Sequence, residues 1–193
     1  MAASRVAADA YRERWPNNQV ALVNHHVDPR VEAALAARPA IPFADAKIGY
    51  FGELVNTVQS PRIDQLVDFT LVDTSRQDAL WFDLLPDYNV HYAVRQTRAL
   101  DHFKPFLKGF TAAACGANVL IHVDGAEARR WLPEDYPYWL TGELNEDNIV
   151  SALVRVRESF GSAEWNAGLD AMADIAAQTD RPAIGRELLS LFQ

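Results

Sequence analysis

The amino-acid sequence predicts an α/β fold, a Rossmann-like parallel sheet with helices on both faces and further helices at the C-terminal end. Two patterns in the 193 residues support this prediction. Short apolar runs alternate with segments of helical periodicity over residues 19–142, which is typical of parallel strands joined by helices. Residues 145–193 then show helical periodicity alone. No low-complexity segment or free linker interrupts the chain, so we expect a single Rossmann-like domain over residues 1–193.

The first elements are indicated by their caps. Ser4 precedes an amphipathic stretch and is suited to cap a helix that starts directly after it. Residues 19–24 (QVALVN) form a short apolar run, which predicts a buried strand. Asp28 stands before Pro29, and this pair is typical of the cap and first turn of a helix over residues 29–38.

The middle of the chain continues the alternation. Ile48, Tyr50 and Phe51 predict a strand that leads into Gly52. Further strands are predicted at residues 69–75, 88–95, 118–124 and 136–142, and helices at residues 61–68, 77–86, 126–133 and in the small-residue segment after Lys108. The breaks at Pro39, Pro42 and Gly161 are interpreted as loops within the domain.

Three helical patterns close the chain, at residues 145–161, 163–179 and 181–193. In the last of them, Ile184, Leu188, Leu189 and Phe192 recur at helical spacing. This apolar face predicts either a helix that packs back on the domain, which is the more usual outcome, or a contact with a partner domain.

Composition argues against several classes of function. A formal net charge of -8 and a pI near 5.0 argue against a nucleic-acid partner, because binding a phosphate backbone requires clustered Lys and Arg. No run of about 20 apolar residues is present, so no membrane span is predicted. The single cysteine, Cys115, excludes an intrachain disulfide and is expected to be a buried, inert thiol. A reducing compartment, the cytoplasm, suits this composition.

Two lysines precede an unusual run of small residues. Lys104 and Lys108 stand before the segment from Ala112 to Ala117, whose side chains bury little apolar area but permit close backbone approach. A helix N-terminus with an adjacent lysine is a ready anion site. The alternative is a pair of solvated lysines with no ligand.

Gly52 follows a predicted strand and is a second candidate for anion binding. A glycine at this point permits backbone N–H groups to approach a phosphate. The alternative is an ordinary turn, and the neighbouring Glu53 would repel phosphate unless its side chain points away. The segment is not a Walker loop, and the three-glycine dinucleotide fingerprint is absent from the sequence.

Other side chains offer weaker chemistry. The histidines lack the spacing of zinc ligands, so no metal is expected. Neither Ser60 nor Ser75 lies in the Gly-x-Ser-x-Gly elbow of serine hydrolases, and no nucleophile or general base is assigned, although Asp101 and His102 flank the candidate lysines. The histidines are His25, His26, His91, His102 and His122, and the tryptophans expected to pack in the core are Trp81, Trp131, Trp139 and Trp165.

Four motifs, taken together, resemble the C-terminal, donor-binding domain of GT-B glycosyltransferases of the group 1, family 4 type. Residues 24–28 (NHHVD) resemble the Asn-Gly-Val-Asp turn that enters that domain, and residues 50–54 (YFGEL) resemble its Gly-Arg-Leu loop. Residues 108–121 (KGFTAAACGANVLI) resemble the helix that ends in Ala-x-Gly and the strand behind it. Residues 136–156 resemble the Gly-x-Leu-Val segment with its helix. Order and approximate spacing agree over residues 20–156.

The resemblance implies a nucleotide-sugar donor whose diphosphate lies against the glycine loop and the N-terminus of the small-residue helix. Gly52 would then form the phosphate loop. Lys108 would be the cation at the diphosphate, with Gly109 beside it, and Thr111 would occupy the position of a ribose-binding residue.

Further binding residues are expected at the end of the predicted strand over residues 88–95. Arg95 and Tyr92 would face the same cleft, where Arg95 pairs with phosphate and Tyr92 stacks on the base. Lys104 would add positive charge. The leaving-group charge would then be stabilised by side chains and helix N–H groups, with neither a cofactor nor a metal.

The implied activity is transfer of a glycosyl group to an unknown acceptor. GT-B enzymes place the acceptor in a separate N-terminal domain, so the resemblance implies that such a domain or a partner protein completes the enzyme. The sequence departs from the family pattern in three ways, and the first two, at Glu53 and Thr111, favour the alternative of a non-catalytic, nucleotide-sensing or protein-interaction module. Glu53 replaces the usual arginine, Thr111 lacks a carboxylate, and the region of residues 69–95 is about one βα unit shorter than in the family.

Overall fold

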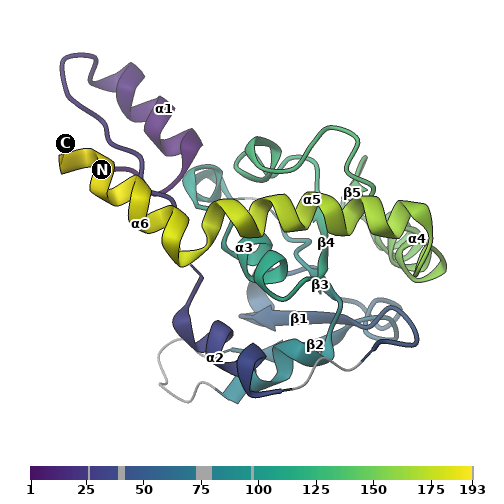
Figure 1. Ribbon diagram of the computed structural model, residues 1–193. Helices are drawn as coiled ribbons and strands as arrows, with labels where there is room; N and C mark the ends of the chain where they lie inside the picture. Colours follow the sequence, from purple (N-terminus) through teal and green to yellow (C-terminus); the bar gives the residue numbers. More distant parts are fainter. Residues whose placement is uncertain (26, 39–41, 73–79, 97, 193) are drawn as a thin grey trace.

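The computed structural model describes residues 1–25, 27–38, 42–72, 80–96 and 98–192. Its strands form a five-stranded, all-parallel sheet in the order β2-β1-β3-β4-β5 (Figure 1). The strands are β1 (Ile48–Gly52), β2 (Asp68–Leu71), β3 (Val90–Tyr92), β4 (Asn118–His122) and β5 (Trp139–Leu140). The predicted α/β class and parallel sheet are therefore confirmed.

The strand order creates a switch point between β1 and β3. From β1 the chain passes to β2 at one edge of the sheet, and it then returns across β1 to β3. Ile48 pairs with Val90 at the start of the two central strands. In sheets of this order, the connections beyond the carboxyl ends of β1 and β3 diverge and leave a crevice for ligands.

Helices cover both faces of the sheet. The α-helices are α1 (Arg5–Arg14), α2 (Pro29–Ala37), α3 (Leu107–Ala114), α4 (Glu146–Glu158), α5 (Ala163–Thr179) and α6 (Arg181–Leu189). The 3₁₀ helices are η1 (Leu54–Asn56), η2 (Leu80–Asp87), η3 (Ala99–Phe103), η4 (Ala128–Arg130) and η5 (Ser190–Phe192).

The handedness of the connections explains this arrangement. The β1–β2 and β3–β4 connections run in opposite directions along the sheet, so right-handed crossovers place them on opposite faces. On the β3–β4 side, α3 contacts both strands and packs against α5, which crosses in front of it in Figure 1. On the other side, Arg62 of the β1–β2 connection pairs with Glu146 and Asp147 of α4.

The predicted helix caps are present. The Ser4 hydroxyl accepts a hydrogen bond from the Ala7 N–H at the start of α1. Asp28 accepts from the Arg30 N–H at the start of α2, with Pro29 as the first helical residue. A short polar side chain before a helix accepts hydrogen bonds from the first backbone N–H groups, which have no partner within the helix. These two helix starts are therefore encoded locally.

The predicted strand over residues 19–24 is wrong. Leu22 makes only a single parallel bridge to Ala2, outside the five-stranded sheet. Its apolar side chain, with that of Val20, instead packs against Ala2, Ala7 and Ala8 in a small cluster apart from the main core.

Three of the predicted connecting helices also differ. Residues 61–66 form hydrogen-bonded turns instead of a helix, and Ile63 and Val67 are buried while Leu66 packs against the core. Residues 80–87 form the 3₁₀ helix η2, which contains Pro86, a residue without a backbone donor. The helix expected over residues 126–133 shortens to the 3₁₀ helix η4, whose N-cap residue Glu127 turns its carboxylate to another element.

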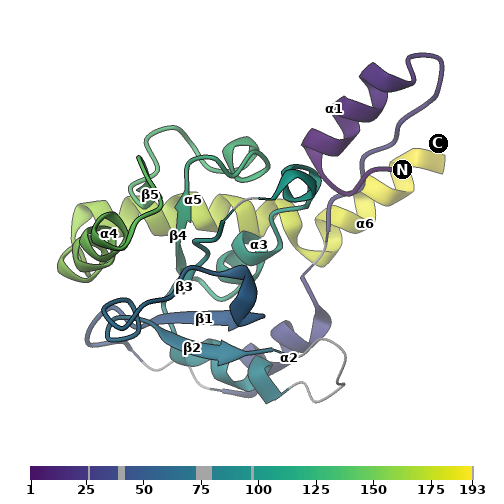
Figure 2. The ribbon, with the colours of Figure 1, turned by 180° about the vertical axis from the view of Figure 1, so that it is seen from behind.

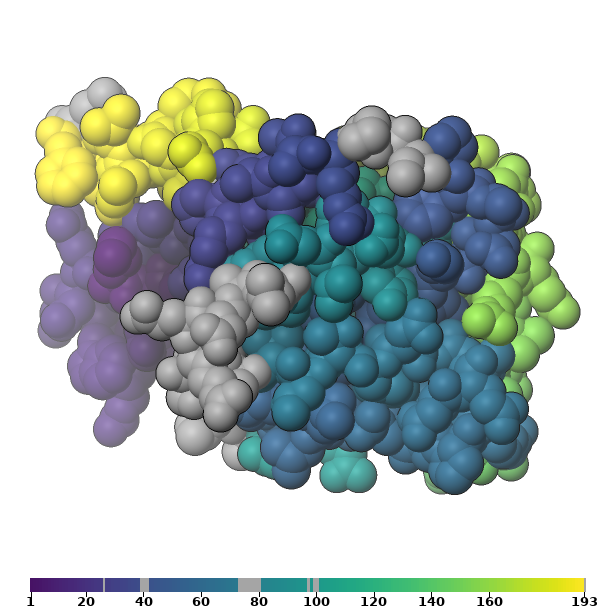
Figure 3. All heavy atoms as spheres, turned by 90° about the horizontal axis from the view of Figure 1, so that it is seen from below, coloured from purple at the N-terminus to yellow at the C-terminus, as the bar shows by residue number. Residues whose placement is uncertain are grey.

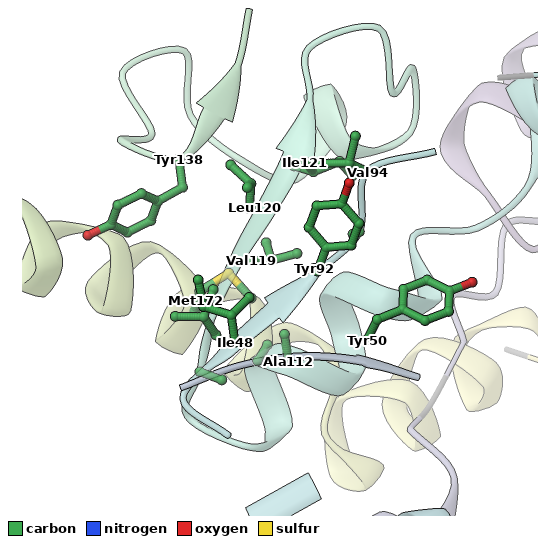
Figure 4. Packing of buried hydrophobic residues seen from close by; sticks show 14 of the residues in the cluster. Ile48, Tyr50, Tyr92, Val94, Ala112, Val119, Leu120, Ile121, Tyr138 and Met172 are labelled. Carbon is green, nitrogen blue, oxygen red and sulfur yellow. The ribbon is translucent and has the colours of Figure 1, made fainter. Parts of the chain in front are cut away.

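The main core lies where the sheet meets α3 and α5. Side chains from β1, β3, β4, α3 and α5 meet in one cluster, part of which Figure 4 shows. Every residue of β3 and β4 is buried. Trp131 and Trp165 are buried, and Trp81 and Trp139 pack against this core, as predicted. Each fully buried large apolar side chain contributes about 1.5–3 kcal/mol to stability.

Helices α1 and α6 form one end of the molecule, away from the sheet (Figures 1 and 2). In Figure 3, α2 lies beside α6, and Arg181 of α6 pairs with Glu32 of α2 at 2.6 Å. Glu187 of α6 accepts hydrogen bonds from the backbone and side-chain amides of Asn24. Although α6 contacts the domain, the apolar residues at its end are exposed, including Leu189 and Phe192. No helix among the described residues combines the length and apolarity that crossing a bilayer would require.

Candidate functional site

The sheet brings Lys108 and Gly52, the last residue of β1, together. Lys108 is the second residue of α3, and its ammonium donates a hydrogen bond of 2.6 Å to the carbonyl of Phe51. The same nitrogen lies 4.0 Å from the centroid of the Tyr50 ring, a cation–π contact. The predicted pair of Lys108 and Gly52 therefore meets at the carboxyl end of β1, beside the switch point of the sheet.

Gly52 permits this approach because it has no side chain. Its φ of 154° lies in a region that other residues rarely adopt. A Cβ at this position would lie 2.9 Å from the Tyr50 hydroxyl and 3.2 Å from the Lys108 Nζ. Glu53 turns its carboxylate to the side-chain amide of Asn56, 2.6 Å away.

Arg95 and Lys104 share a single carboxylate. Asp101 of η3 forms ion pairs with Arg95 and, at 2.7 Å, with Lys104, and it also accepts from the Arg98 N–H. Burial favours the neutral form of Asp101, but the hydrogen bonds from Lys104, Arg98 and Arg95 outweigh this effect and hold the pKa of the carboxyl below its usual range. Asp101 therefore remains ionised and is poorly suited to accept a proton as a general base.

Besides Lys104, a second lysine, Lys108, lies near Arg95 and feels its positive charge. Burial, together with the positive charge of Arg95, lowers the pKa of Lys108 to about 8. Desolvation and a like charge both disfavour the ammonium form, so an anion placed between these two side chains would relieve both effects. The N-terminus of α3 adds partial positive charge, because its N-cap residue Phe106 provides no side-chain hydrogen bond.

Gly109 has a packing role in α3. A Cβ at this position would overlap the ring of Phe106, which packs edge-on against Phe110 with ring centroids 5.9 Å apart. Gly109 is buried, and it does not line either of the two cavities described next.

A cavity of about 310 Å³ opens beside the three cations. Arg95, Lys104 and Lys108 line the part formed by the β3–α3 connection. Asp124 and Glu127 line the part formed by the connection after β4. Asp101, which pairs with Arg95 and Lys104, also lines the cavity, so the cations lie on the β3–α3 side and carboxylates lie on both sides. The cavity therefore presents donors to an anion and acceptors to hydroxyl groups.

The two carboxylates after β4 differ in their availability. Both oxygens of Glu127 are engaged, since the N–H groups of Arg5 and Val6 donate to them at 2.9 Å and the Trp131 ring N–H donates at 3.1 Å. Asp124 is 73% exposed and lies 3.4 Å from the Nδ1 of His122. Asp124 is therefore the acceptor that a ligand would reach more readily.

A second cavity, of about 490 Å³, lies at the β1, η2 and α3 side of Lys108. Phe51, Trp81 and Phe110 contribute aromatic rings to its lining. Thr111 also lines this cavity, and Lys108 lines both cavities. Lys108 therefore borders both a cavity that contains several charged side chains and a cavity that contains several aromatic rings.

His91 of β3 lines the aromatic cavity and is 5% exposed. Its Nε2 atom has no hydrogen-bond partner among the described residues. Burial, assisted by the positive charge of Lys108, lowers the pKa of His91 to about 3, so the imidazole is neutral at pH 7. From the sequence, His91 was tested only as a metal ligand. Its position between Val90 and Tyr92 in an apolar strand is the signal that would have indicated a buried polar group.

Tyr92 and Arg95 do not share a cleft as predicted. Arg95 lines the 310 Å³ cavity, whereas Tyr92 borders the 490 Å³ cavity. Tyr92 is 1% exposed, and its hydroxyl donates to the Val58 carbonyl at 3.0 Å. Its ring packs edge-on against Tyr50, with centroids 6.4 Å apart, so in this structure it is a core residue.

The remaining candidate groups have structural partners. Burial raises the pKa of Cys115 to about 12, which agrees with the predicted inert thiol. The Nε2 of His122 is engaged with the Gly142 carbonyl at 2.8 Å, and Ser60 accepts from the Ile63 N–H. His26, Pro39 and Ser75 lie outside the described residues. Within the described part of the chain, no group of three or more His, Cys, Asp or Glu side chains is placed to hold a metal ion.

We compared the chain with models of protein families and with curated proteins, and neither comparison found a match.

Proposed function

We propose that this protein binds a nucleotide sugar at the carboxyl edge of its sheet and takes part in glycosyl transfer. The observation that carries the proposal is the convergence of Arg95, Lys104 and Lys108 on one cavity at the start of α3. Asp101 is shared by Arg95 and Lys104, whereas Lys108 forms no ion pair among the described residues, so Arg95 and Lys108 retain N–H donors for a ligand. A diphosphate is the anion that suits two cations and a helix N-terminus.

The carboxylates after β4 support a sugar-bearing ligand over a simple anion. Asp124 can accept hydrogen bonds from hydroxyl groups within the cavity that holds the cations. A nucleotide sugar carries negative charge on its diphosphate and hydroxyl groups on its sugar and ribose. Its groups therefore match both parts of the lining.

The proposed reaction breaks the bond between the anomeric carbon and a diphosphate oxygen and forms a bond from that carbon to an acceptor hydroxyl. The nucleoside diphosphate leaves with the electron pair, and the acceptor hydroxyl loses its proton. Lys108 and Arg95 stabilise the charge that develops on the leaving group. Because its three donors lower the pKa of Asp101 and make this carboxylate a weak base, the proton acceptor would come from the acceptor-binding domain or partner.

A thermal-shift panel with UDP, GDP, ADP and dTDP, with and without attached sugars, tests the proposal. A ligand at about 100 times its dissociation constant stabilises the folded state by about 2.7 kcal/mol. We expect Arg95→Ala and Lys108→Ala to reduce this shift. Lys47→Ala is the matched control, because Lys47 immediately precedes β1 and so lies at the amino-terminal end of that strand, opposite the candidate site. Unchanged nucleotide affinity in both cavity variants would refute the assignment.

One observation favours a second candidate, a non-catalytic module that senses nucleotides or binds proteins. The carboxylate nearest the cations, Asp101, is committed to ion pairs, and Thr111 offers no carboxylate to a ribose. A thermal shift without sugar hydrolysis or transfer, even when candidate acceptors are supplied, would favour nucleotide sensing. No shift with any nucleotide would favour protein interaction.

A further inference from the structure

We infer that the 490 Å³ cavity holds the base of the nucleotide, with His91 hydrogen-bonded to the edge of the base. This inference rests on the proposed function, which places the diphosphate at Lys108, and it adds a site for the rest of the ligand. The cavity lies at the carboxyl ends of β1 and β3, between η2 and α3.

The lining of the cavity suits a planar ring. Phe51 and Trp81 have ring centroids 6.1 Å apart with an angle of 33° between their planes, and Phe110 contributes a third ring. A base presents an apolar face to such surfaces, and base–aromatic stacking contributes about 1–3 kcal/mol per base. The volume falls within the range of small-molecule sites, about 300–1,000 Å³.

His91 supplies the hydrogen bond that such a ring requires. A buried polar atom without a partner costs about 1–3 kcal/mol, so its persistence calls for an explanation. Among the described residues, two other buried side-chain atoms lack a hydrogen-bond partner, the Arg95 Nε and the Asn118 Oδ1. Only His91 of these three lines the aromatic cavity. The Nε2 atom is closed to solvent in this structure, so the imidazole must turn toward the cavity before a ligand bonds to Nε2 and removes this cost.

The charge state of His91 selects the kind of ligand group. A neutral imidazole has one donor and one acceptor nitrogen, which match the uncharged edge of a base. Phosphate would instead favour a protonated imidazole, and the nearby Lys108 opposes protonation of His91. The phosphates and the base would thus occupy different cavities that share the wall formed by Lys108.

The position of Tyr92 supports the same assignment. Tyr92 was expected to stack on the base, but its ring is enclosed by Tyr50 and Phe69 and its hydroxyl bonds to the Val58 carbonyl. The rings of Phe51 and Trp81 remain partly exposed and line the cavity. These two residues replace Tyr92 as the expected stacking surface.

Calorimetry with two probes tests the inference, inorganic pyrophosphate and the nucleoside diphosphates UDP, GDP, ADP and dTDP. In His91→Phe we expect the tightest-binding nucleoside diphosphate to lose about tenfold in affinity, the equivalent of one hydrogen bond. Pyrophosphate should bind this variant as it binds the wild type. Lys108→Ala should weaken both probes.

A second measurement on the unmodified protein guards against misfolding of the variant. In ¹⁵N spectra of the histidine side chains, the nucleoside diphosphate should shift the His91 Nε2 signal, whereas pyrophosphate alone should leave it nearly unchanged. Nucleoside diphosphates could instead bind the wild type and His91→Phe with equal affinity and leave the His91 signal unshifted. The base would then lie elsewhere, and the proposed function would still stand. If neither probe binds the wild type, both proposals fail.

Discussion

At the scale of single residues, the candidate site depends on side chains whose protonation and shape are set by their neighbours. Lys108 is held between Tyr50, the Phe51 carbonyl and the field of Arg95. Gly52 makes room for it. The sequence indicated both Lys108 and Gly52, because a lysine before small residues and a glycine after a strand are local patterns. It did not indicate His91, whose significance arises only from the cavity beside it.

The lowered pKa of Lys108 predicts a pH dependence of anion binding. The ammonium is present below a pKa of about 8 and is lost above it. Binding of an anion requires the ammonium, so the affinity for pyrophosphate should decrease about tenfold between pH 7 and pH 9. Pyrophosphate gains negative charge over this range, which acts in the opposite direction and makes a decrease diagnostic.

Lys108→Arg is the control for this pH dependence, since a guanidinium stays protonated throughout. Calorimetric titrations of the variant should show no comparable decrease. Parallel curves for the wild type and Lys108→Arg would contradict the role of Lys108.

The lowered pKa of Lys108 also affects the stability of the fold. Between about pH 8 and 10.5 the unfolded chain binds the additional proton, so the contribution of Lys108 to stability rises with pH there.

At the scale of elements, helix ends were more predictable than connections. The caps at Ser4 and Asp28 act within three residues, so the sequence is sufficient to place the starts of α1 and α2. The connections over residues 61–66 and 80–87 carry apolar residues at helical spacing, yet they form turns and a 3₁₀ helix. The 3₁₀ helix η2, for example, packs against α2, a segment distant in sequence that the local pattern does not contain.

A pair of glycine substitutions tests the packing of α3. Gly109→Ala should destabilise the protein by about 1–3 kcal/mol, because the new methyl group would overlap the Phe106 ring. Gly185→Ala in α6 is the matched control, since an added Cβ there meets nothing within 4 Å. It should stabilise α6 by up to about 1 kcal/mol through helix propensity. Urea unfolding measures both effects, and equal stability of Gly109→Ala and the wild type would contradict this account of α3.

At the scale of the whole molecule, polar contacts attach the end formed by α1 and α6 to the rest of the fold. Glu127 accepts from the first N–H groups of α1, and Arg5 stacks over Trp131 at 3.9 Å. The small apolar cluster around Ala8 is separate from the main core. Elements with few buried apolar contacts open at a lower free energy than core strands.

Hydrogen exchange of Glu127→Gln tests this attachment. The amide nitrogen of glutamine cannot accept the N–H groups of Arg5 or Val6, so the amides of α1 should exchange faster, by the equivalent of about 1–3 kcal/mol. The amides of β4 should keep their protection. Glu134→Gln, an exposed residue of the same region, is the control. Uniform acceleration in α1 and β4 would show that α1 opens only with global unfolding.

The sequence by itself determined the α/β class, the order of most strands and helices, the helix caps and the two residues that meet at the start of α3. These features follow from periodicity and from hydrogen bonds between neighbours in the chain. The tertiary structure alone decided that residues 19–24 lie outside the sheet, that Tyr92 is enclosed, that Asp101 is held ionised by Arg95 and Lys104, and that Lys108 lines two cavities. Each of these depends on contacts between segments distant in sequence, because burial and electrostatic fields are set by the packed neighbours and not by the adjacent residues.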